Sequence, residues 1–329
     1  MKFKHLTWAA AVAAVCFAAL AGGGLARAGT PDAQLLRMYQ PVTRFDAEER
    51  FRPTSVQSFV ADAELERFVS GTWVVADSDP EPGELPGPGT GIWRLNQDSC
   101  SPALPLGGLS CYADAWGEGS GGGVVYSRVA RTGGSIVLQY WYFYYDNTYS
   151  YAYPPSDFIW QAHEGDWEVV NVVLSADEEP LYVGYSQHCL GQRRDWSQTP
   201  RWDGTHPFVH VAVGSHANYF AAGTRPINVS CIPPQAIGLL LALGLPLPVD
   251  RTGTGEIAGP PQAGDRVTPI VRVDNDAHQW VAFPGFWGEL EYLHAPIVGT
   301  VPFGTGPVGP AYHAVWQNPL GTLAAWPVG

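Results

Sequence analysis

One segment of this chain, HEGDWE (163–168), combines residue types that could bind a metal ion. Asp166 and Glu168 are two residues apart, so both carboxylates point to the same face if the segment is a strand. His163 lies just before them, at the expected turn into that strand. Asp146 ends the preceding aromatic segment, and a return of the chain through the polar residues between them can bring it close to Asp166.

Carboxylates and an imidazole that converge on one point repel each other unless a cation or a proton joins them. An oxygen-rich ligand set with one nitrogen suits Ca²⁺ or Mg²⁺ better than zinc. The sequence therefore predicts a divalent-cation site, Ca²⁺ or Mg²⁺, with four ligands: Asp146, His163, Asp166 and Glu168. The alternative is that these acids only solubilise the edge of a strand.

Several polar residues downstream could line a ligand cleft beside this site. His206 and His210 are four residues apart on one expected strand and share its face. The predicted cleft residues are Glu164, His188, His206, His210, His216 and Asn218. The chain has no serine elbow, phosphate loop or zinc-protease helix motif. If it is an enzyme, His210 and His216 are the candidates for proton transfer.

A sheet must position these residues. Runs of β-branched and aromatic residues predict strands at 135–146, 166–174, 181–188, 206–214, 269–273 and 279–283. A short helix is expected in PTSVQSFVADAELERFV (53–69), starting near Pro53. Because no βαβ alternation occurs, we expect a mainly β fold, a β-sandwich with long loops and a short helical N-terminal arm (29–75). In WYFYY (141–145) half of the rings should face the core, and the others should cover a second layer or stack on sugars.

The N-terminus resembles a secretory signal. Lys2 and Lys4 precede an apolar run, and small residues lead to Ala28. We expect residues 1–28 to be a cleaved signal peptide, residues 29–329 to form a single domain, and the protein to be secreted or periplasmic. The apolar segment 234–248 is too short to span a bilayer, so no transmembrane segment is expected after processing. It is interpreted as a buried helix or packed connection, with interfacial membrane contact as the alternative.

Charge and cysteine content narrow the possible partners. Removal of residues 1–28 takes away Lys2, Lys4 and Arg27 and no acidic residue, which leaves 15 arginines against 31 acidic residues and a formal net charge of −16. This charge disfavours nucleic acid as a partner. Four cysteines remain, and export favours two disulfides, preferably Cys100–Cys111 and Cys189–Cys231. A four-cysteine zinc site is the alternative, although the sequence lacks a C-x2-C pair.

Most of the chain after the signal resembles the vacuolar protein sorting-associated protein 62 family. The matching blocks are YWYFYYD, HEGDWEVVNVVL, LYVGYSQH, HPFVHVAVGSHANY and FPGFWGEL…GPVGPAYHAVWQNPL, and the arm PVTRFDAEERFRPTSVQSFV is also similar to the opening of that family. The resemblance implies one related domain over 29–329. It implies little about activity.

A more distant resemblance is to the necrosis- and ethylene-inducing-like toxins, whose heptapeptide GHRHDWE reads AHEGDWE here, after WYFYYD. In that family an aspartate after the aromatic strand and three heptapeptide residues hold a divalent cation in a β-sandwich cleft that receives a sphingolipid sugar head group. The resemblance implies the same four ligands on this chain: Asp146, His163, Asp166 and Glu168. Gly165 replaces the second histidine, and Glu164 reverses the charge of an arginine at the expected cleft rim. These departures put the toxins' ligand and membrane damage in doubt.

The sequence therefore favours an exported divalent-cation-binding protein that recognises a glycan or lipid head group through the cation. A metal-dependent hydrolase of phosphate or glycosidic esters is the alternative. A purely structural or envelope-associated protein is a third possibility. Binding is preferred over catalysis because no nucleophile or dedicated base stands out.

Overall fold

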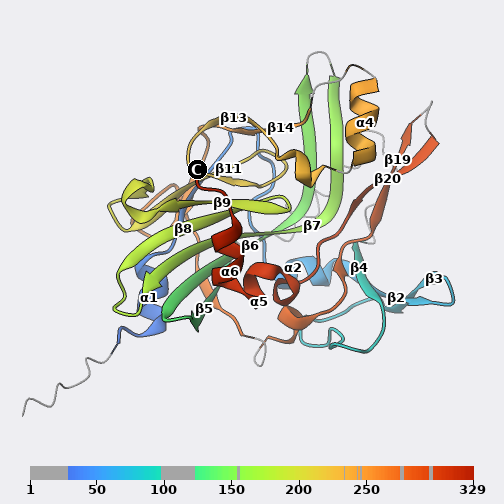
Figure 1. Cartoon of the computed structure of the whole chain (residues 1–329). Helices are drawn as coiled ribbons and strands as arrows, with labels where there is room; N and C mark the ends of the chain where they lie inside the picture. Colours follow the sequence, from blue (N-terminus) through green and yellow to red (C-terminus); the bar gives the residue numbers. More distant parts are fainter. Residues whose placement is uncertain are drawn as a thin grey trace, which may run out of the picture.

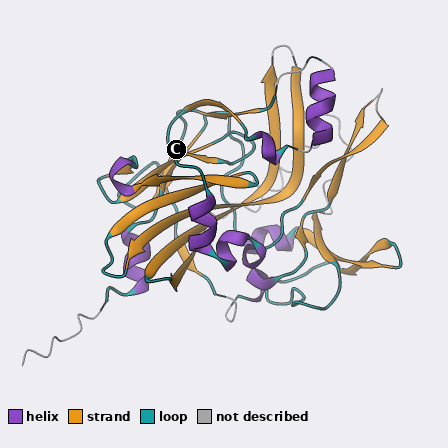
Figure 2. Ribbon diagram, viewed as in Figure 1, coloured by secondary structure: helices purple, strands orange, loops and turns teal. Residues whose placement is uncertain are grey.

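The computed structural model describes residues 29–97, 123–153, 156–232, 234–242, 244, 247–274, 278–295 and 299–329. The expected signal peptide and the expected Cys100–Cys111 disulfide lie outside these residues. Within them the fold is mainly β, a β-sandwich of several mixed sheets joined by long loops (Figures 1 and 2). The C-terminal segment packs back onto the molecule, where Arg193 forms an isolated β-bridge with Val328.

The largest sheet carries the residues of interest. Its six strands follow the order β17-β5-β6-β7-β8-β9. Their bounds are β5 Val125–Thr132, β6 Ser135–Tyr153, β7 Ser156–Ser175, β8 Pro180–Gln187, β9 Leu190–Asp195 and β17 Ile270–Arg272. The paired β6 and β7 continue well beyond their neighbours and form a long ribbon that projects beside α4 (Figure 1). Asp146 and His163 therefore lie within long strands, although Asp146 was expected to end its strand and His163 to lie at a turn.

A second six-stranded sheet follows the order β10-β11-β1-β15-β16, with β12 paired to β11. Its strands are β1 Val42–Phe45, β10 Arg201–Trp202, β11 His206–Val211, β12 Asn218–Tyr219, β15 Ile257–Gly259 and β16 Arg266–Val267. β1 is parallel to β11, so the N-terminal arm lies directly beside the histidine-bearing strand. This pairing brings residues near the N-terminus to the candidate site.

Smaller sheets complete the β structure. A four-stranded sheet joins β18 Phe286–Trp287, β4 Trp93–Gln97, β2 Ala63–Val69 and β3 Thr72–Asp77 in that order. Two hairpins pair β13 Gly223–Pro226 with β14 Val249–Thr252 and β19 Leu290–Ala295 with β20 Gly299–Thr305. The helices are α1 Asp32–Met38, α2 Val56–Ala61, α4 Pro234–Ala242, α5 Ala314–Gln317 and α6 Pro319–Ala325. The 3₁₀ turns are η1 Trp196–Gln198, η2 Val229–Cys231, η3 Gln279–Ala282 and η4 Pro310–Tyr312.

The aromatic segment WYFYY lies entirely in the core. Trp141, Phe143 and Tyr145 are fully buried on one face, and Tyr142 and Tyr144 are buried on the other. Strand alternation sends successive rings to opposite faces, so burial of all five means that both faces of β6 are covered. The interpretation as core and layer cover is confirmed, and these rings present no exposed stacking surface for sugars.

Three sequence predictions are corrected by the structure. The segment 279–283 is the 3₁₀ turn η3 rather than a strand, and this turn packs both Trp280 and Val281 into the core. The helix expected over 53–69 is confined to α2, which Ser55 caps, and the following residues pair with β3 and β4 as β2. The apolar segment 234–248 does form a helix, α4, but Leu241 is 68% exposed.

None of the helices in the described part of the chain is long and apolar enough to cross a membrane.

Candidate functional site

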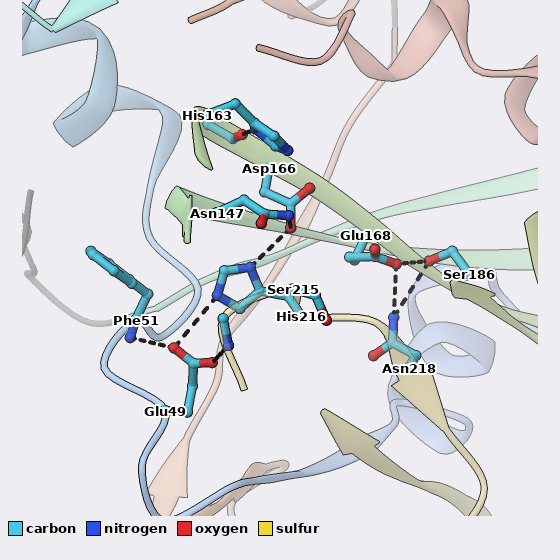
Figure 3. Close-up of polar contacts among 12 residues, drawn as sticks. Glu49, Phe51, Asn147, His163, Asp166, Glu168, Ser186, Ser215, His216 and Asn218 are labelled. Carbon is cyan, nitrogen blue, oxygen red and sulfur yellow. Dashed lines mark hydrogen bonds and ion pairs between the residues drawn. The ribbon is translucent and has the colours of Figure 1, made fainter. Parts of the chain in front are cut away.

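The site is built around Gly165, between the acids of β7. Its φ of 61° lies in the left-handed region, and a Cβ there would lie 2.3 Å from the carbonyl oxygen of Trp287. The position therefore requires glycine. Strict alternation would place His163 and Asp166 on opposite faces. However, the cross-strand partner of His163 is Asn147, and Asn147 Nδ2 donates to Asp166 Oδ2 at 3.4 Å. The three side chains lie together in Figure 3.

His216 connects the ribbon to the N-terminal arm. Its Nδ1 donates to Asp166 Oδ2 at 2.9 Å, and its Nε2 lies 3.5 Å from Glu49 Oε1 (Figure 3). The imidazole stacks on Tyr144, with ring centroids 3.8 Å apart and an interplanar angle of 3°. The histidine is fully buried. We call the four residues Glu49, Asp166, Glu168 and His216 the acidic cluster.

The charges in the acidic cluster are strongly perturbed. Burial disfavours the imidazolium of His216, but Glu49 and Asp166 outweigh burial and raise its pKa to about 10. Burial disfavours the Glu49 carboxylate, yet the imidazolium and two backbone N–H donors hold its pKa below the usual range. At neutral pH His216 is therefore a buried cation between two carboxylates.

Glu168 lies on the other side of Asp166. It accepts hydrogen bonds at Oε2 from Ser186 Oγ and, at 3.3 Å, from Asn218 Nδ2 (Figure 3). Burial and then the nearby Asp166 carboxylate raise its pKa well above the ordinary value. A raised pKa favours the neutral carboxylic acid, so full ionisation of Glu168 beside Asp166 requires a further positive charge.

His163 has one ring nitrogen already engaged. Its Nδ1 lies 2.7 Å from the carbonyl oxygen of Gly165. A carbonyl only accepts, so Nδ1 carries the proton and Nε2 of the neutral ring keeps a lone pair. A backbone carbonyl on the remote nitrogen is the arrangement that orients histidine ligands in metal sites.

Asp146 and Glu164 belong to the opposite side of the ribbon. They are cross-strand partners, and after burial and Asp62 they raise the pKa of Tyr145. In contrast, the pKa of Tyr144 responds to Glu168, Glu49 and Asp166. Glu164 is fully buried and accepts from the backbone N–H groups of residues 97 and 289, so it does not lie at a cleft rim.

The other predicted cleft histidines lie apart from the acidic cluster. His188 Nε2 lies 2.7 Å from Asp250 Oδ2. His206 Nδ1 donates to the carbonyl of Gln40 at 2.7 Å. His210 is half-buried beside Arg44, and burial followed by that guanidinium lowers its pKa. Of the predicted cleft residues, only His216 and Asn218 contact the acids of β7.

Three residues of the site, Glu49, Asn147 and Ser186, were missed in the sequence. Glu49 lies in the arm, and nothing local in DAEER marks it as a partner of His216. Ser186 could have been found, because β7 and β8 are adjacent antiparallel strands and a serine at 186 can reach the face that carries Glu168. Glu49 could not be found because its contact with His216 depends on long-range strand pairing, which the local sequence does not show.

The donor types at the site suit an oxygen-preferring cation. Asp166 and Glu168 are bonded through Oδ2 and Oε2, and no described residue donates to their other oxygens. In the described part of the chain, however, no three His, Cys, Asp or Glu side chains converge in an arrangement that could hold a metal ion. The protein side chains by themselves therefore supply only part of a coordination shell.

No family model and no curated protein matches the chain, so the resemblance to the vacuolar protein sorting-associated protein 62 family has no support from these comparisons. The chain is similar to solved structures of toxin-fold proteins. One, described as a toxin fold as basis for microbial attack and plant defense, is 12% identical with a TM-score of 0.37 and covers 88% of this chain and 89% of its own. Another, NLPPya in complex with mannosamine, is 12% identical with a TM-score of 0.38 over the same shares.

A third similar structure is necrosis and ethylene inducing protein 2 from the causal agent of cocoa's witches' broom disease. It is 15% identical with a TM-score of 0.32, and covers 59% of this chain and 68% of its own. Because identities and TM-scores are this low, we draw no functional conclusion from these likenesses.

Proposed function

We propose that this protein binds a divalent cation, Ca²⁺ or Mg²⁺, at Asp166 and Glu168, and through it the hydroxyls or phosphate of a glycan or lipid head group. The observation that carries the proposal is the charge of the acidic cluster. The acidic cluster brings three carboxyl groups (Glu49, Asp166 and Glu168) together with one imidazolium, and the raised pKa of Glu168 reflects, after burial, the cost of a further negative charge beside Asp166. A divalent cation would remove that cost and keep Glu168 ionised.

The proposed site has two protein ligands, the carboxylates of Asp166 and Glu168, because no three such side chains converge in the described residues. His163 keeps a lone pair at Nε2 but is not assigned as a ligand, and neither is Asp146, which belongs to the Tyr145 side. Ca²⁺ takes 6–8 oxygen ligands. With two ligands from the protein, most positions would fall to waters or to ligand hydroxyls. Open coordination positions of this kind would let the cation bind a ligand, which a cation that only stabilises a loop does not do.

Export forms part of the proposal. The Cys189–Cys231 disulfide supports it, since structural disulfides persist in oxidising compartments and are rare in the cytosol. The signal-like N-terminus points the same way.

The hydrolase alternative gains no specific support. A proton-transfer residue works best with a pKa near the operating pH. His216 is fully buried with a pKa of about 10 and stays protonated. His210 contacts neither Asp166 nor Glu168, and it lies beside a guanidinium. We therefore propose binding as the function.

The first prediction tests the cation. Calorimetric titration of the chelator-treated protein with Ca²⁺ and Mg²⁺ should show saturable binding, and bound cation should raise the midpoint of thermal unfolding. Asp166→Asn keeps the shape of the side chain and removes its charge, so it should abolish binding and the thermal response. Asp177→Asn, which changes an exposed acid in the β7–β8 turn, is the matched control and should change neither. Equal cation affinity in Asp166→Asn and the parent would contradict the proposed site.

The head group is tested separately. Glycan and lipid arrays probed with the cation-loaded protein should give signals that vanish with chelator and with Asp166→Asn. Signals that persist in chelator would mean that the ligand binds without the cation.

A further inference from the structure

A polar pocket lies beside the disulfide and shares no residue with the acidic cluster. Its volume is about 350 Å³. The polar side chains that line it are Gln187, His188, Gln192, Tyr219, Arg225 and Asn228. They come from the β8–β9 hairpin, from β12, and from the segment that runs from β13 into η2. Pockets of this volume accommodate small ligands.

The disulfide ties two walls of this pocket together. Cys189 directly follows His188 at the β8–β9 turn, and Cys231 ends η2, three residues after Asn228. The two Cα atoms are 5.3 Å apart, although the cysteines are 42 residues apart in the sequence. The covalent link holds the pocket walls at a fixed separation, so a ligand meets a preformed site.

Arg225 gives the pocket its charge. Its guanidinium lies 5.0 Å from the centroid of the Tyr219 ring and donates to Thr252 Oγ1 at 3.3 Å and to the carbonyl of Ala222 at 3.1 Å. These partners are neutral, and Arg225 forms no ion pair with any residue that the structure describes. In a chain with a net charge of −13, an arginine held in a pocket without an acidic partner is a feature that favours an anion.

The carboxylate of Asp250, which lies behind the pocket, is already engaged. Asp250 accepts from Ser215 Oγ at 2.6 Å and from Tyr219 OH at 2.5 Å, and it pairs with His188 at 2.7 Å. Burial lowers the pKa of His188, but Asp250 outweighs burial and the net pKa is raised. Asp250 is the cross-strand partner of Arg225, but its oxygens are engaged by these three side chains and it forms no ion pair with Arg225.

Neutral amides surround this charge. Gln187 donates through Nε2 to the carbonyl of Asn218 at 2.8 Å, which leaves its Oε1 as an acceptor. Asn228 accepts through Oδ1 from the backbone N–H of Ser230 at 3.0 Å, which leaves its Nδ2 as a donor. Leu190 and Pro327 add apolar surface to the lining. The hydrogen-bond acceptors, donors and apolar surface around the Arg225 guanidinium would complement a sugar ring that carries several hydroxyls and one anionic group.

We propose that this pocket binds an anionic sugar, with the carboxylate or phosphate held by Arg225 and the hydroxyls by the amides of Gln187 and Asn228. The disulfide keeps the site formed, so the oxidised protein is the binding form. This site is independent of the cation proposed above.

Calorimetry in the presence of chelator tests the proposal. D-Glucuronate and glucose 6-phosphate are the two anionic arms, and glucose is the neutral parent. At least one anionic sugar should bind about tenfold more tightly than glucose. Whichever of the two sugars binds more tightly shows whether Arg225 prefers a carboxylate or a phosphate. Arg225→Gln should weaken that binding about tenfold or more, and the Cys189→Ser/Cys231→Ser double variant should also weaken it.

Two further variants keep the outcome interpretable. Ile227→Trp fills the pocket without changing its charge and should block binding. Arg131→Gln removes an exposed arginine on β5 and should leave binding unchanged. The proposal is overturned if neither anionic sugar binds, if glucose binds as tightly, or if Arg225→Gln and Ile227→Trp both bind as the parent does. Thermal unfolding of each variant confirms that it is folded.

Discussion

A single buried imidazolium joins two parts of the chain that are far apart in sequence. His216 lies between Glu49 of the arm and Asp166 of the ribbon, stacked on Tyr144. Removing one member of a buried charge network leaves the others without compensation, which costs more than the loss of a surface pair. His216 is therefore as much a structural residue as a member of the candidate site.

Replacement of His216 tests that role. His216→Phe preserves the stacking on Tyr144 and removes the positive charge, so the free energy of unfolding should fall by about 3–5 kcal/mol. His210→Phe changes a half-buried histidine on β11 and should cost less than about 1 kcal/mol. Urea unfolding monitored by fluorescence measures both. Equal losses in the two variants would show that the charge of His216 contributes nothing to stability.

The His188–Asp250 pair predicts a pH dependence of stability. The pKa of His188 is raised above 6.5, so its contribution is complete below about pH 6.5 and disappears as the pH rises through the raised value. The pKa of Asp250 is lowered below 3.8, so its contribution is present above about pH 4 and disappears at lower pH. Ser215, Tyr219 and the more distant Asp166 also act on the pair.

We therefore compare the parent with His188→Gln, which keeps a donor towards Asp250 without a charge. The difference in free energy of unfolding should be largest between about pH 4 and 6.5, on the order of 2 kcal/mol, and smaller at about pH 9. Urea unfolding of both proteins at about pH 6.5 and at about pH 9 measures this difference. A difference that does not change with pH would mean that His188 is neutral throughout.

At the scale of elements, the β6–β7 ribbon depends on one glycine. Gly165→Ala would force a left-handed residue to carry a Cβ within 2.3 Å of a carbonyl oxygen of Trp287, and the expected cost is about 3 kcal/mol or more. Gly134 has a φ of 74° and open space around its Cβ position. Gly134→Ala should cost only about 1 kcal/mol, the penalty of the conformation itself. Chemical denaturation measures the free energy of unfolding of both variants. Similar losses in the two would contradict the close contact between position 165 and Trp287.

Local pattern predicted five of the observed strands (β6, β7, β8, β11 and β17) but missed the others and did not show where each strand ended. The β-branched and aromatic runs around Trp141 and Val170 predicted the centres of β6 and β7. The segments that continue both strands past Asp146, NTYSYAY (147–153) and SDFIWQA (156–162), contain aromatic and β-branched residues that favour strands, so the expectation of a polar loop there was wrong. The two sides of the ribbon, which separate Asp146 from Asp166, could not be read from spacing, because they depend on the pairing of the two strands.

The candidate site was predictable to a similar degree. Alternation placed Asp166 and Glu168 on one side, and Glu168 does respond to Asp166. The left-handed conformation of Gly165 brings His163 and Asp166 to the same side of the strand. The sequence did not predict this, because a glycine in a strand does not show which φ it adopts. The contact between Glu49 and His216 follows from the pairing of β1 with β11, which connects segments about 165 residues apart.

At the scale of the whole molecule, the pairing of the cysteines tests the proposed export to an oxidising environment. Cys189–Cys231 is present, and Cys100 and Cys111 lie outside the described residues. Thiol titration of the processed protein under denaturing, non-reducing conditions should find no free thiol. Closing a loop of 42 residues stabilises the fold by about 4 kcal/mol on the chain-entropy account, so Cys189→Ala/Cys231→Ala should lower the free energy of unfolding by a comparable amount. Two or more thiols per chain would exclude a second disulfide.

The packing of the indoles has an optical consequence. Trp167 is stacked on Trp280, with centroids 5.8 Å apart and an interplanar angle of 8°, and it meets Trp287 edge-on at 5.4 Å and Trp141 at 6.4 Å. Indoles at these separations couple their electronic transitions and exchange excitation energy. The folded core should therefore give an intense near-ultraviolet circular dichroism band and depolarised emission, both of which vanish when the rings separate. The protein thus contains its own spectroscopic reporter, next to Gly165 and the acidic cluster, for every unfolding experiment proposed above.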